Sequence, residues 1–445
     1  MSGTAFSDLN LNKALLNALE EMKLEQPTVI QDRAFSVIMS GADVVGIAQT
    51  GTGKTLAYLL PCLSQWKFTR DKAPSILILV PTRELVAQVV QNVEEVTRFM
   101  NVRVGGAYGG TNIKTQIAML GEGLDVLVAT PGRLLDLIFN GSLKVKQIKK
   151  LVIDEVDEML TLGFRDQLGK ILDLLPDRRQ SLLFSATLTD EVEKIIATFF
   201  QLPKRIEAAP AGTPLDNITQ TAYQVPNFNT KVNLLNALLT DEALSKVLVF
   251  TASKRLANAL HERLEETFAD TVGVVHANKD QNYRFQAVNN FADGTFRILI
   301  ATDLISRGLD IAHVSHVVNF DLPDIPENYI HRIGRTGRAD RDGQAIAMIT
   351  PKDDQRREQI ESLMRMAIPE LELPESVEIS EVLTMDEMPV DHREGATLRK
   401  RKREPSGPAF HEKKAKNQKV NIRYDHAKEM RKKYGKPKRK GGKQR

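Results

Sequence analysis

The chain has 445 residues, which is too long for a single hydrophobic core and predicts two domains with additional segments. No apolar run approaches the length that spans a bilayer and no signal sequence begins the chain, so we expect a soluble, non-secreted protein without a membrane partner. The one cysteine, Cys62, excludes an internal disulfide and a multi-cysteine metal site, and it fits a reducing cytosolic or nuclear compartment.

The formal net charge of +4 is the sum of two unlike parts. Residues 393–445 contain 21 Lys and Arg against 5 Asp and Glu, whereas residues 1–392 contain 40 against 52. An acidic body with a basic tail predicts a polyanionic partner for the tail. The tail has almost no apolar residues, so we expect it to be disordered.

Two helical segments are predicted before the first strand. Leu15 and Leu19 lie at helical spacing within residues 1–25. Pro27 suits the start of a second helix, in which Gln31 offers both a donor and an acceptor, as the edge of adenine requires. Spacing alone favours a glutamine that faces water.

Short apolar runs alternate with helical stretches through most of the chain. Each run is continuous, which is typical of parallel strands buried on both faces. The predicted fold class is therefore α/β, with two tandem parallel-sheet units whose ligand chemistry lies in the loops after the strands. The runs are residues 44–47, 76–80, 126–129, 151–153 and 182–184 in the first unit, and 247–250, 272–275, 298–300, 317–318 and 346–349 in the second.

Changes in composition predict the domain boundaries. Prolines and a glycine without periodicity mark a linker, and an acidic, loosely periodic stretch follows the second unit. The predicted organisation is a first domain at 1–205, a linker at 206–216, a second domain at 217–368, an acidic linker at 369–392 and the basic tail at 393–445.

The first strand leads through a glycine-rich turn into a helix, which is the context of a phosphate-binding loop. Gly51 and Gly53 let successive N–H groups converge on phosphate oxygens, and the helix adds the positive end of its dipole. Lys54 would reach the β- and γ-phosphates, and the Thr55 hydroxyl would bind Mg²⁺. Because Ala48 replaces the first glycine of the general pattern, the alternative interpretation, an ordinary glycine turn followed by a threonine that caps the helix, is not excluded.

Carboxylates follow the strand at 151–153, where a nucleoside triphosphatase holds its metal. Asp154 would bind Mg²⁺ through water, and Glu155 would activate the attacking water. The alternative is a set of solvated carboxylates that cap the next helix. Like charges at a strand end repel without a cation, which favours the metal site.

Residues 331–338 contain three arginines with no acidic residue among them. A triphosphate in its transition state is a natural counter-charge, because arginine offers bidentate geometry to phosphate. A solvated basic loop and an RNA-phosphate contact are the alternatives, and spacing does not separate them.

The ordered set of motifs over residues 6–350 resembles the DEAD-box RNA helicases of superfamily 2, and among these the bacterial RhlE-like proteins most. The resemblance implies two RecA-like domains, ATP and Mg²⁺ as cofactors, RNA as partner, and a cytoplasmic RNA-dependent ATPase that locally unwinds short duplexes in ribosome assembly or RNA decay. It also makes Ala48 the usual first letter of the phosphate loop. The motifs are residues 26–31, 48–55, 81–85, 109–110, 130–133, 154–157, 185–187, Gln281 with Arg284, 301–303, 307–310 and 331–338.

The resemblance also assigns roles to individual residues. ATP binding falls to Thr28, Gln31, Gln49, Thr50, Gly51, Thr52, Gly53, Lys54, Thr55, Gly308 and Asp310. Catalysis falls to Lys54, Glu155, Arg335 and Arg338, and Mg²⁺ binding to Thr55 and Asp154. Coupling of ATP state to RNA binding falls to Asp157, Ser185, Thr187 and His331. RNA binding falls to Arg83, Gly110, Thr130, Gly132, Arg133, Arg284 and Thr302.

Two residues depart from the family pattern. Val156 replaces the alanine of Asp-Glu-Ala-Asp, and we expect it to be tolerated because it adds neither charge nor hydrogen bond. Leu24 stands where the family has an aromatic residue that stacks on adenine, which predicts weaker stacking.

Splitting the site across two domains predicts that hydrolysis requires domain closure. An ATP-gated RNA clamp without productive unwinding, or a DNA helicase, would use the same fold. The basic tail would bind RNA phosphates, with Tyr424 and Tyr434 stacking on bases, or it would only keep the acidic body soluble.

Overall fold

The computed structural model describes residues 5–49, 51–208, 217–303, 314–337, 342–384 and 387. By its internal contacts the chain divides into a unit from Met1 to Met388 and a unit from Pro389 to Arg445. All described residues belong to the first unit, so the disordered tail predicted for 393–445 lies outside them.

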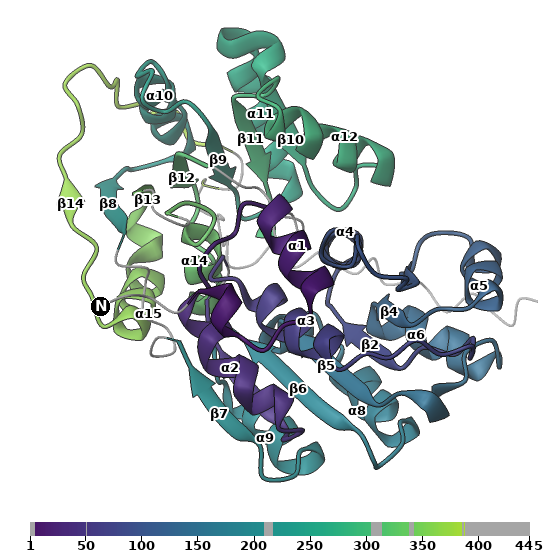
Figure 1. Cartoon of the computed structure of the whole chain (residues 1–445). Coiled ribbons are helices and arrows are strands. Elements are labelled where there is room, and N and C mark those ends of the chain that lie inside the picture. Colours follow the sequence, from purple (N-terminus) through teal and green to yellow (C-terminus); the bar gives the residue numbers. More distant parts are fainter. Residues whose placement is uncertain are drawn as a thin grey trace, which may run out of the picture. The chain divides into compact units, whose positions relative to one another are not determined.

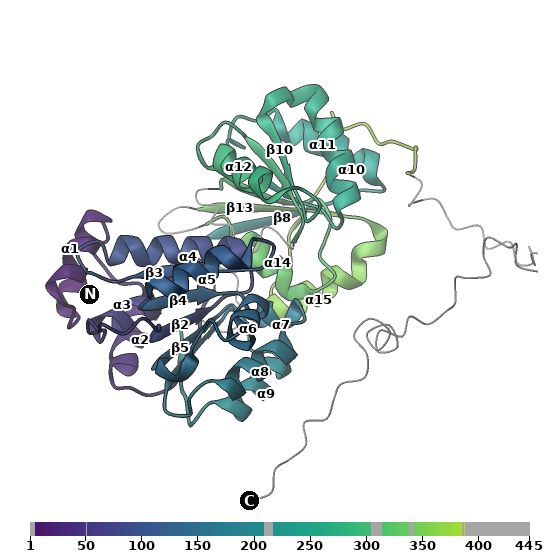
Figure 2. The same ribbon diagram turned by 90° about the vertical axis from the view of Figure 1, so that its right-hand side faces the viewer.

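The first sheet has seven parallel strands in the order β3-β4-β2-β5-β6-β1-β7. Figure 2 shows β3, β4, β2 and β5 side by side in this order. The last strand continues two residues past the domain boundary expected at 205. The strands are β1 (Val44–Ile47), β2 (Ile76–Leu79), β3 (Val104–Ala107), β4 (Val126–Ala129), β5 (Lys150–Asp154), β6 (Gln180–Ser185) and β7 (Lys204–Glu207).

Helices cover both faces of this sheet. Successive strand residues point to opposite faces, so Val44 packs in one core cluster with α2, α3 and α4, and Val45 packs in another with α6, α8 and α9. The continuous apolar runs follow from this burial on both sides, as the sequence predicted. The helices are α1 (Lys13–Glu21), α2 (Val29–Met39), α3 (Lys54–Ser64), α4 (Arg83–Val96), α5 (Ile113–Glu122), α6 (Pro131–Phe139), α7 (Val156–Thr161), α8 (Arg165–Leu174) and α9 (Asp190–Phe199).

The second sheet repeats this architecture with seven parallel strands in the order β10-β11-β9-β12-β13-β8-β14 (Figure 1). The strands are β8 (Ile218–Gln224), β9 (Val247–Phe250), β10 (Val272–Val275), β11 (Ile298–Ala301), β12 (His316–Asn319), β13 (Gly343–Ile349) and β14 (Glu370–Leu371). The helices are α10 (Phe228–Leu239), α11 (Lys254–Phe268), α12 (Gln281–Ala292), α14 (Pro326–Ile333) and α15 (Asp354–Met364). None of the helices that the structure describes is long and apolar enough to cross a bilayer.

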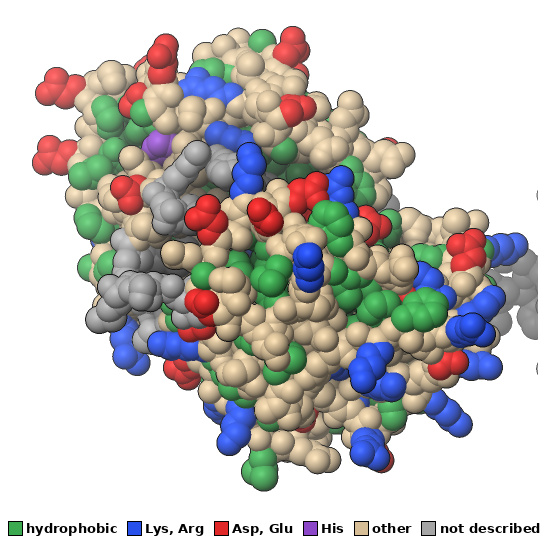
Figure 3. All heavy atoms as spheres, in the orientation of Figure 1, with side chains coloured by type: hydrophobic (Ala, Val, Ile, Leu, Met, Phe, Trp, Pro, Cys, Tyr) green, Lys and Arg blue, Asp and Glu red, His purple; other side chains and the backbone are tan. Residues whose placement is uncertain are grey.

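The segment expected as an acidic linker from residue 369 is packed on the second domain over its described part. β14 pairs with β8, and Val377 is buried in the same core cluster as α10. Asn229 and Asn233 of α10 donate to the backbone oxygens of Val382 and Glu378, both at 2.8 Å. Figure 3 has the orientation of Figure 1, and it shows acidic side chains projecting at the place where Figure 1 draws this segment. Hydropathy missed this packing because most of these contacts join polar side chains and backbone groups, which apolar periodicity does not report.

Candidate functional site

The glycine-rich turn after β1 ends where α3 begins, at Lys54. Gly51 and Gly53 have φ angles of +84° and +87°, in the left-handed region that favours glycine. Gln49 is buried, and its carbonyl oxygen accepts from the Thr52 hydroxyl at 2.7 Å. This turn therefore has the backbone that the sequence predicted for a phosphate-binding loop.

Lys54 is the residue of this loop that needs a ligand. Its side chain is 6% exposed, and Nζ is buried without a hydrogen-bond partner among the described residues. Asp154 and Asp157 act electrostatically on this ammonium, but neither accepts a hydrogen bond from Nζ, and a buried donor without an acceptor is costly. The arrangement fits a phosphate group, with Thr55 in the same first turn of α3. Thr50 lies outside the described residues.

Gln31 joins α2 to the phosphate loop. Its Oε1 accepts from the Thr28 N–H at 2.9 Å, and its Nε2 donates to the Gly53 carbonyl oxygen at 3.0 Å. The side chain is 4% exposed, so the sequence reading that it faces water is wrong. One N–H and one lone pair of the amide stay available, which leaves its predicted contact with adenine chemically feasible. Leu24 packs against the core of the first domain.

Asp154 ends β5 inside the protein rather than in solvent. Burial raises the pKa of its carboxyl to about 6, with Lys54 acting against this and Glu155 adding to it. The Tyr58 hydroxyl donates to Asp154 Oδ2 at 3.0 Å. Glu155, also buried, has a φ of +52°, a conformation that stores strain in a residue with a side chain. Solvated carboxylates are thereby excluded, although Asp154 Oδ1 accepts from the Glu155 N–H at 3.0 Å as a local cap.

These residues fit a Mg²⁺ ion that the nucleotide brings with it. In the described ranges no group of three or more His, Cys, Asp and Glu residues could hold a metal. Magnesium is usually held by one or two carboxylates together with substrate phosphates and water. The buried Asp154 carboxyl and the Thr55 hydroxyl supply oxygen atoms of the required type.

Asp157 connects three segments that are distant in sequence. Its Oδ2 accepts from the Thr187 N–H at 3.0 Å and from the Thr187 hydroxyl at 2.9 Å. His331 Nε2 of α14 lies 3.7 Å from the same oxygen. Burial opposes ionisation, but His331, Lys54 and Thr187 together hold the pKa of Asp157 well below its usual range. The carboxylate is therefore a fixed negative charge between the two sheets.

Ser185 contributes to this region through its backbone. Its carbonyl oxygen accepts from the Ala48 N–H at 3.0 Å, which ties the end of β6 to the phosphate loop. Its hydroxyl is buried without a partner among the residues the structure describes. The segment 185–187 thus contacts both the phosphate loop and Asp157, and its coupling of ATP state to RNA binding stays a prediction.

The arginine cluster at 331–338 contains one residue with a structural role. Arg332 is 2% exposed and forms a bidentate ion pair with Asp303, with Nη2 and Oδ2 at 2.8 Å. It also donates to Asn319 Oδ1 at 3.1 Å. The cluster itself contains no acidic residue. Arg332 is neutralised by Asp303, which lies outside the cluster, after β11. Arg335 is buried, while Gly308, Asp310 and Arg338 lie outside the described residues.

Comparisons with known proteins identify the family. A model described as DEAD/DEAH box helicase matches residues 28–195, and one described as helicase conserved C-terminal domain matches residues 230–340. The chain is 38% identical over 350 residues to the DEAD-box ATP-dependent RNA helicase CshA of Geobacillus kaustophilus, a match that covers 79% of this chain and 74% of that protein. The chain belongs to the DEAD-box ATP-dependent RNA helicase family.

Other DEAD-box relatives agree over a similar length. The RNA helicase CrhR of Synechocystis sp. is 37% identical, over 83% of this chain and 75% of that protein. Among solved structures, Saccharomyces cerevisiae Dbp5 bound to RNA and ADP BeF3 matches with a TM-score of 0.76 and 30% identity, over 83% of this chain and 96% of that one. Mss116p bound to ssRNA and AMP-PNP matches with a TM-score of 0.77 and 26% identity, over 83% of this chain and 80% of that one. Both sheets are therefore RecA-like domains, as predicted, while the RhlE-like subgroup stays a prediction.

The predicted RNA-binding residues of the first helicase domain follow β2, β3 and β4, in the turn at Gly110 and at the starts of α4 and α6. The Arg83 guanidinium packs on Gly110, whose φ is +77° and where a Cβ atom would collide with it. Thr130 is the N-cap of α6, and Gly132 lies in its first turn. Arg133 is 8% exposed, so it presents little surface to a ligand.

Arg133 supports a loop in this helicase. Its Nη1 donates to Gln116 Oε1 at 2.8 Å and its Nη2 to the Thr111 carbonyl oxygen at 3.0 Å. These bonds fix the turn that contains Gly110. We therefore expect Arg133 to affect RNA binding by holding this turn in place and not by contacting RNA itself.

A cluster of polar side chains joins the two helicase domains at the same edge. Glu84 of α4 forms an ion pair with Arg284 of α12 and accepts from Gln281 Nε2 at 3.0 Å. Gln281 Oε1 accepts from Arg284 Nη1 at 3.2 Å and lies 3.4 Å from Arg83 Nη1. Two of the three predicted RNA-binding arginines, Arg83 and Arg284, thus contact the other helicase domain. Thr302 is half-buried after β11. Glu84 was not predicted as a site residue, although it lies within the motif at 81–85.

Proposed function

We propose that this DEAD-box helicase hydrolyses ATP at the phosphate loop and uses closure of its two domains to open short RNA duplexes locally. The observation that carries the proposal is Lys54, a buried ammonium without a hydrogen-bond partner in the described part of the chain. An incoming triphosphate would supply the hydrogen-bond acceptors that Lys54 Nζ lacks.

The chemistry would divide among residues of the first domain. Lys54 would bind the terminal phosphates, and Glu155 would take a proton from the attacking water. Thr55 and Asp154 would hold Mg²⁺, which neutralises charge on the phosphate oxygens. The amide of Gln31 would bind adenine while it keeps its bond to the Gly53 carbonyl oxygen.

The second domain would complete the site on closure. We propose that Arg335 and Arg338 stabilise the charge of the transition state, and that Gly308 and Asp310 contact the nucleotide. Asp157 lies between Thr187 and His331, which supports its proposed role in linking the ATP site to the relative position of the domains.

RNA would bind along the loops that carry Arg83, Gly110 and Thr130. Because Arg83 and Arg284 both contact side chains of the other domain, RNA phosphates would compete with Glu84 for Arg284 and favour one domain arrangement over another. RNA and ATP would then assist each other's binding through the same closed state.

The decisive experiment compares Lys54→Ala and Glu155→Gln with the wild-type chain. We expect both variants to lose RNA-stimulated ATP hydrolysis and duplex unwinding, with Glu155→Gln retaining ATP binding. A Glu155→Gln variant with wild-type turnover would remove the proposed base. If the wild type binds RNA in an ATP-dependent manner without separating short duplexes, the protein is an RNA clamp instead. Stimulation by DNA as strong as by RNA would favour a DNA helicase.

We further propose that the protein acts in the cytoplasm on ribosomal or RNA-degradation assemblies, as an RhlE-like member of the family. Crosslinking in cells, followed by identification of the bound RNA, would test this role.

A further inference from the structure

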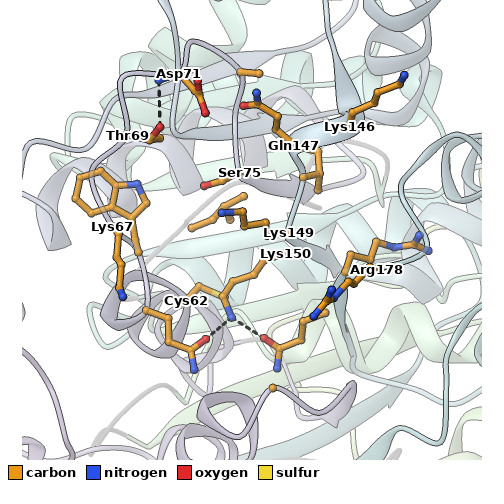
Figure 4. Close-up of a pocket in the computed structure, with 18 of the residues that line it drawn as sticks. Cys62, Lys67, Thr69, Asp71, Ser75, Lys146, Gln147, Lys149, Lys150 and Arg178 are labelled. Carbon is orange, nitrogen blue, oxygen red and sulfur yellow. Dashed lines mark hydrogen bonds between the residues drawn. The ribbon is translucent and has the colours of Figure 1, made fainter.

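A cavity lies in the first domain, away from the phosphate loop. Its volume is about 900 Å³, and it is lined by the end of α3 and by the residues that enter β2, β5 and β6 (Figure 4). The proposed ATP and RNA residues follow the carboxyl ends of the strands, whereas this cavity lies at the amino ends. A four-residue strand separates the two edges by roughly 13 Å.

The cavity carries a large excess of positive charge. Among its lining residues, Asp71 is the one carboxylate, against six cationic side chains: Lys67, Lys146, Lys149, Lys150, Arg178 and Arg179. Within the described part of the chain, Lys67, Lys146, Lys149 and Arg178 form no ion pair. Asp43 and Asp177 act electrostatically on Arg179, so its charge is partly compensated.

Lys150 is compensated only by neutral groups. Its Nζ donates to Gln65 Oε1 at 2.6 Å and to Gln180 Oε1 at 2.5 Å, as Figure 4 shows. Burial lowers the pKa of this ammonium. An anion in the cavity would offset that cost. The adjacent Cys62 does not supply one, because burial raises the pKa of its thiol to about 11.

Two buried donors at the cavity are unused. Trp66 Nε1 and Arg179 Nε are both buried without a hydrogen-bond partner among the described residues. Buried donors usually have partners, but both atoms have almost no accessible surface, so a ligand in the cavity would reach them only after these side chains shift. The opposing explanation is that these cations only offset the carbonyl end of α3, which lies here at Ser64. That explanation accounts for positive charge near Ser64, but it does not account for six cationic side chains around one cavity.

We propose that this cavity binds a small ligand with two or more adjacent phosphates, either an inorganic oligophosphate or a nucleoside polyphosphate. Several cations around one cavity match a ligand with adjacent phosphates. The volume is within the range of small-ligand sites. A free ligand fits better than an RNA strand, since the proposed RNA residues lie at the other end of the sheet.

Trp66 makes the proposal directly testable, because it is the only tryptophan of the chain. Full-length protein is titrated with inorganic triphosphate at constant ionic strength, and Trp66 fluorescence and the heat of binding are recorded together. We expect a saturable change that the Lys149→Glu/Arg178→Glu variant weakens at least tenfold. The neutral variant Lys149→Gln/Arg178→Gln, checked by circular dichroism, guards against a folding defect. Lys13→Glu, at an exposed lysine on α1, is the matched control and is expected to bind as the wild type does.

The Lys54→Ala variant distinguishes binding at this cavity from binding at the proposed ATP site. We expect it to retain the change in Trp66 fluorescence. The proposal fails if no saturable response occurs, if the response is lost in Lys54→Ala, or if the charge variants bind like the wild type. If the Lys54→Ala variant binds ADP more tightly than inorganic triphosphate, the ligand of the cavity is a nucleoside polyphosphate. If it binds inorganic triphosphate more tightly than ADP, the ligand is an inorganic oligophosphate. A single-stranded RNA oligonucleotide and ADP are also compared as competitors of triphosphate. If the RNA displaces triphosphate at a lower concentration than ADP does, the cavity is an RNA-binding site and the proposal is wrong.

Discussion

Replacing the buried Asp154 with asparagine should abolish RNA-stimulated ATP hydrolysis and yet stabilise the nucleotide-free protein. Burial raises the pKa of this carboxyl from its ordinary value of 3.8 to about 6, even with Lys54 nearby. This difference of about 2 pKa units corresponds to about 3 kcal/mol at 1.36 kcal/mol per unit. Asparagine keeps an acceptor for the Tyr58 hydroxyl and removes the cost of the buried charge.

The sign of the pH dependence follows from the raised pKa. Between pH 4 and pH 6 the folded protein binds more protons at Asp154 than the unfolded chain does, so wild-type stability falls as the pH rises through this window. The gain from Asp154→Asn should therefore be about 3 kcal/mol at pH 7.5 and roughly half of that at pH 5.

Urea unfolding followed by Trp66 fluorescence, without nucleotide or Mg²⁺, measures this gain in the domain that contains Asp154. Asp173→Asn, at an exposed carboxylate on α8, is the control and should change stability by less than about 0.5 kcal/mol. An Asp154→Asn variant that is no more stable than the wild type at pH 7.5 would refute the reasoning. A gain of equal size at pH 5 and pH 7.5 would refute it as well.

Three further perturbations test other parts of the molecule. Arg332→Lys removes the bidentate pair with Asp303 and should destabilise the second domain by about 3 kcal/mol, measured by calorimetry against wild type; an unchanged unfolding profile would contradict the assignment. Glu84→Gln should release Arg284 and raise ATP-independent RNA affinity by about tenfold in fluorescence anisotropy at fixed salt, which corresponds to about 1.4 kcal/mol; weaker binding would show that Glu84 assists RNA binding instead. Deleting 393–445 should weaken RNA binding and flatten its salt dependence while ATP affinity is retained; an unchanged salt slope would favour a tail that serves solubility alone.

The sequence determined the local features of this helicase. Continuous apolar runs identified the parallel strands, because burial on both faces leaves no alternation. The glycines at 51 and 53, followed by Lys54, predicted a phosphate-binding loop, and both glycines have the positive φ that only glycine adopts readily. The carboxylates after β5 were found from their position at a strand end, and the motif order assigned the family before any contact was known.

The tertiary structure decided how these features meet. Gln31 on Gly53, Asp157 between Thr187 and His331, and Glu84 on Arg284 each join residues far apart in the chain. Hydrophobic periodicity shows which face of a helix or strand is buried. It does not show which polar groups of other elements contact that helix or strand. The packing of residues 370–384 on β8 and α10 and the cationic cavity beside Trp66 escaped the sequence for the same reason. Both depend on the spatial convergence of segments whose local patterns indicate only loops and solvated charge.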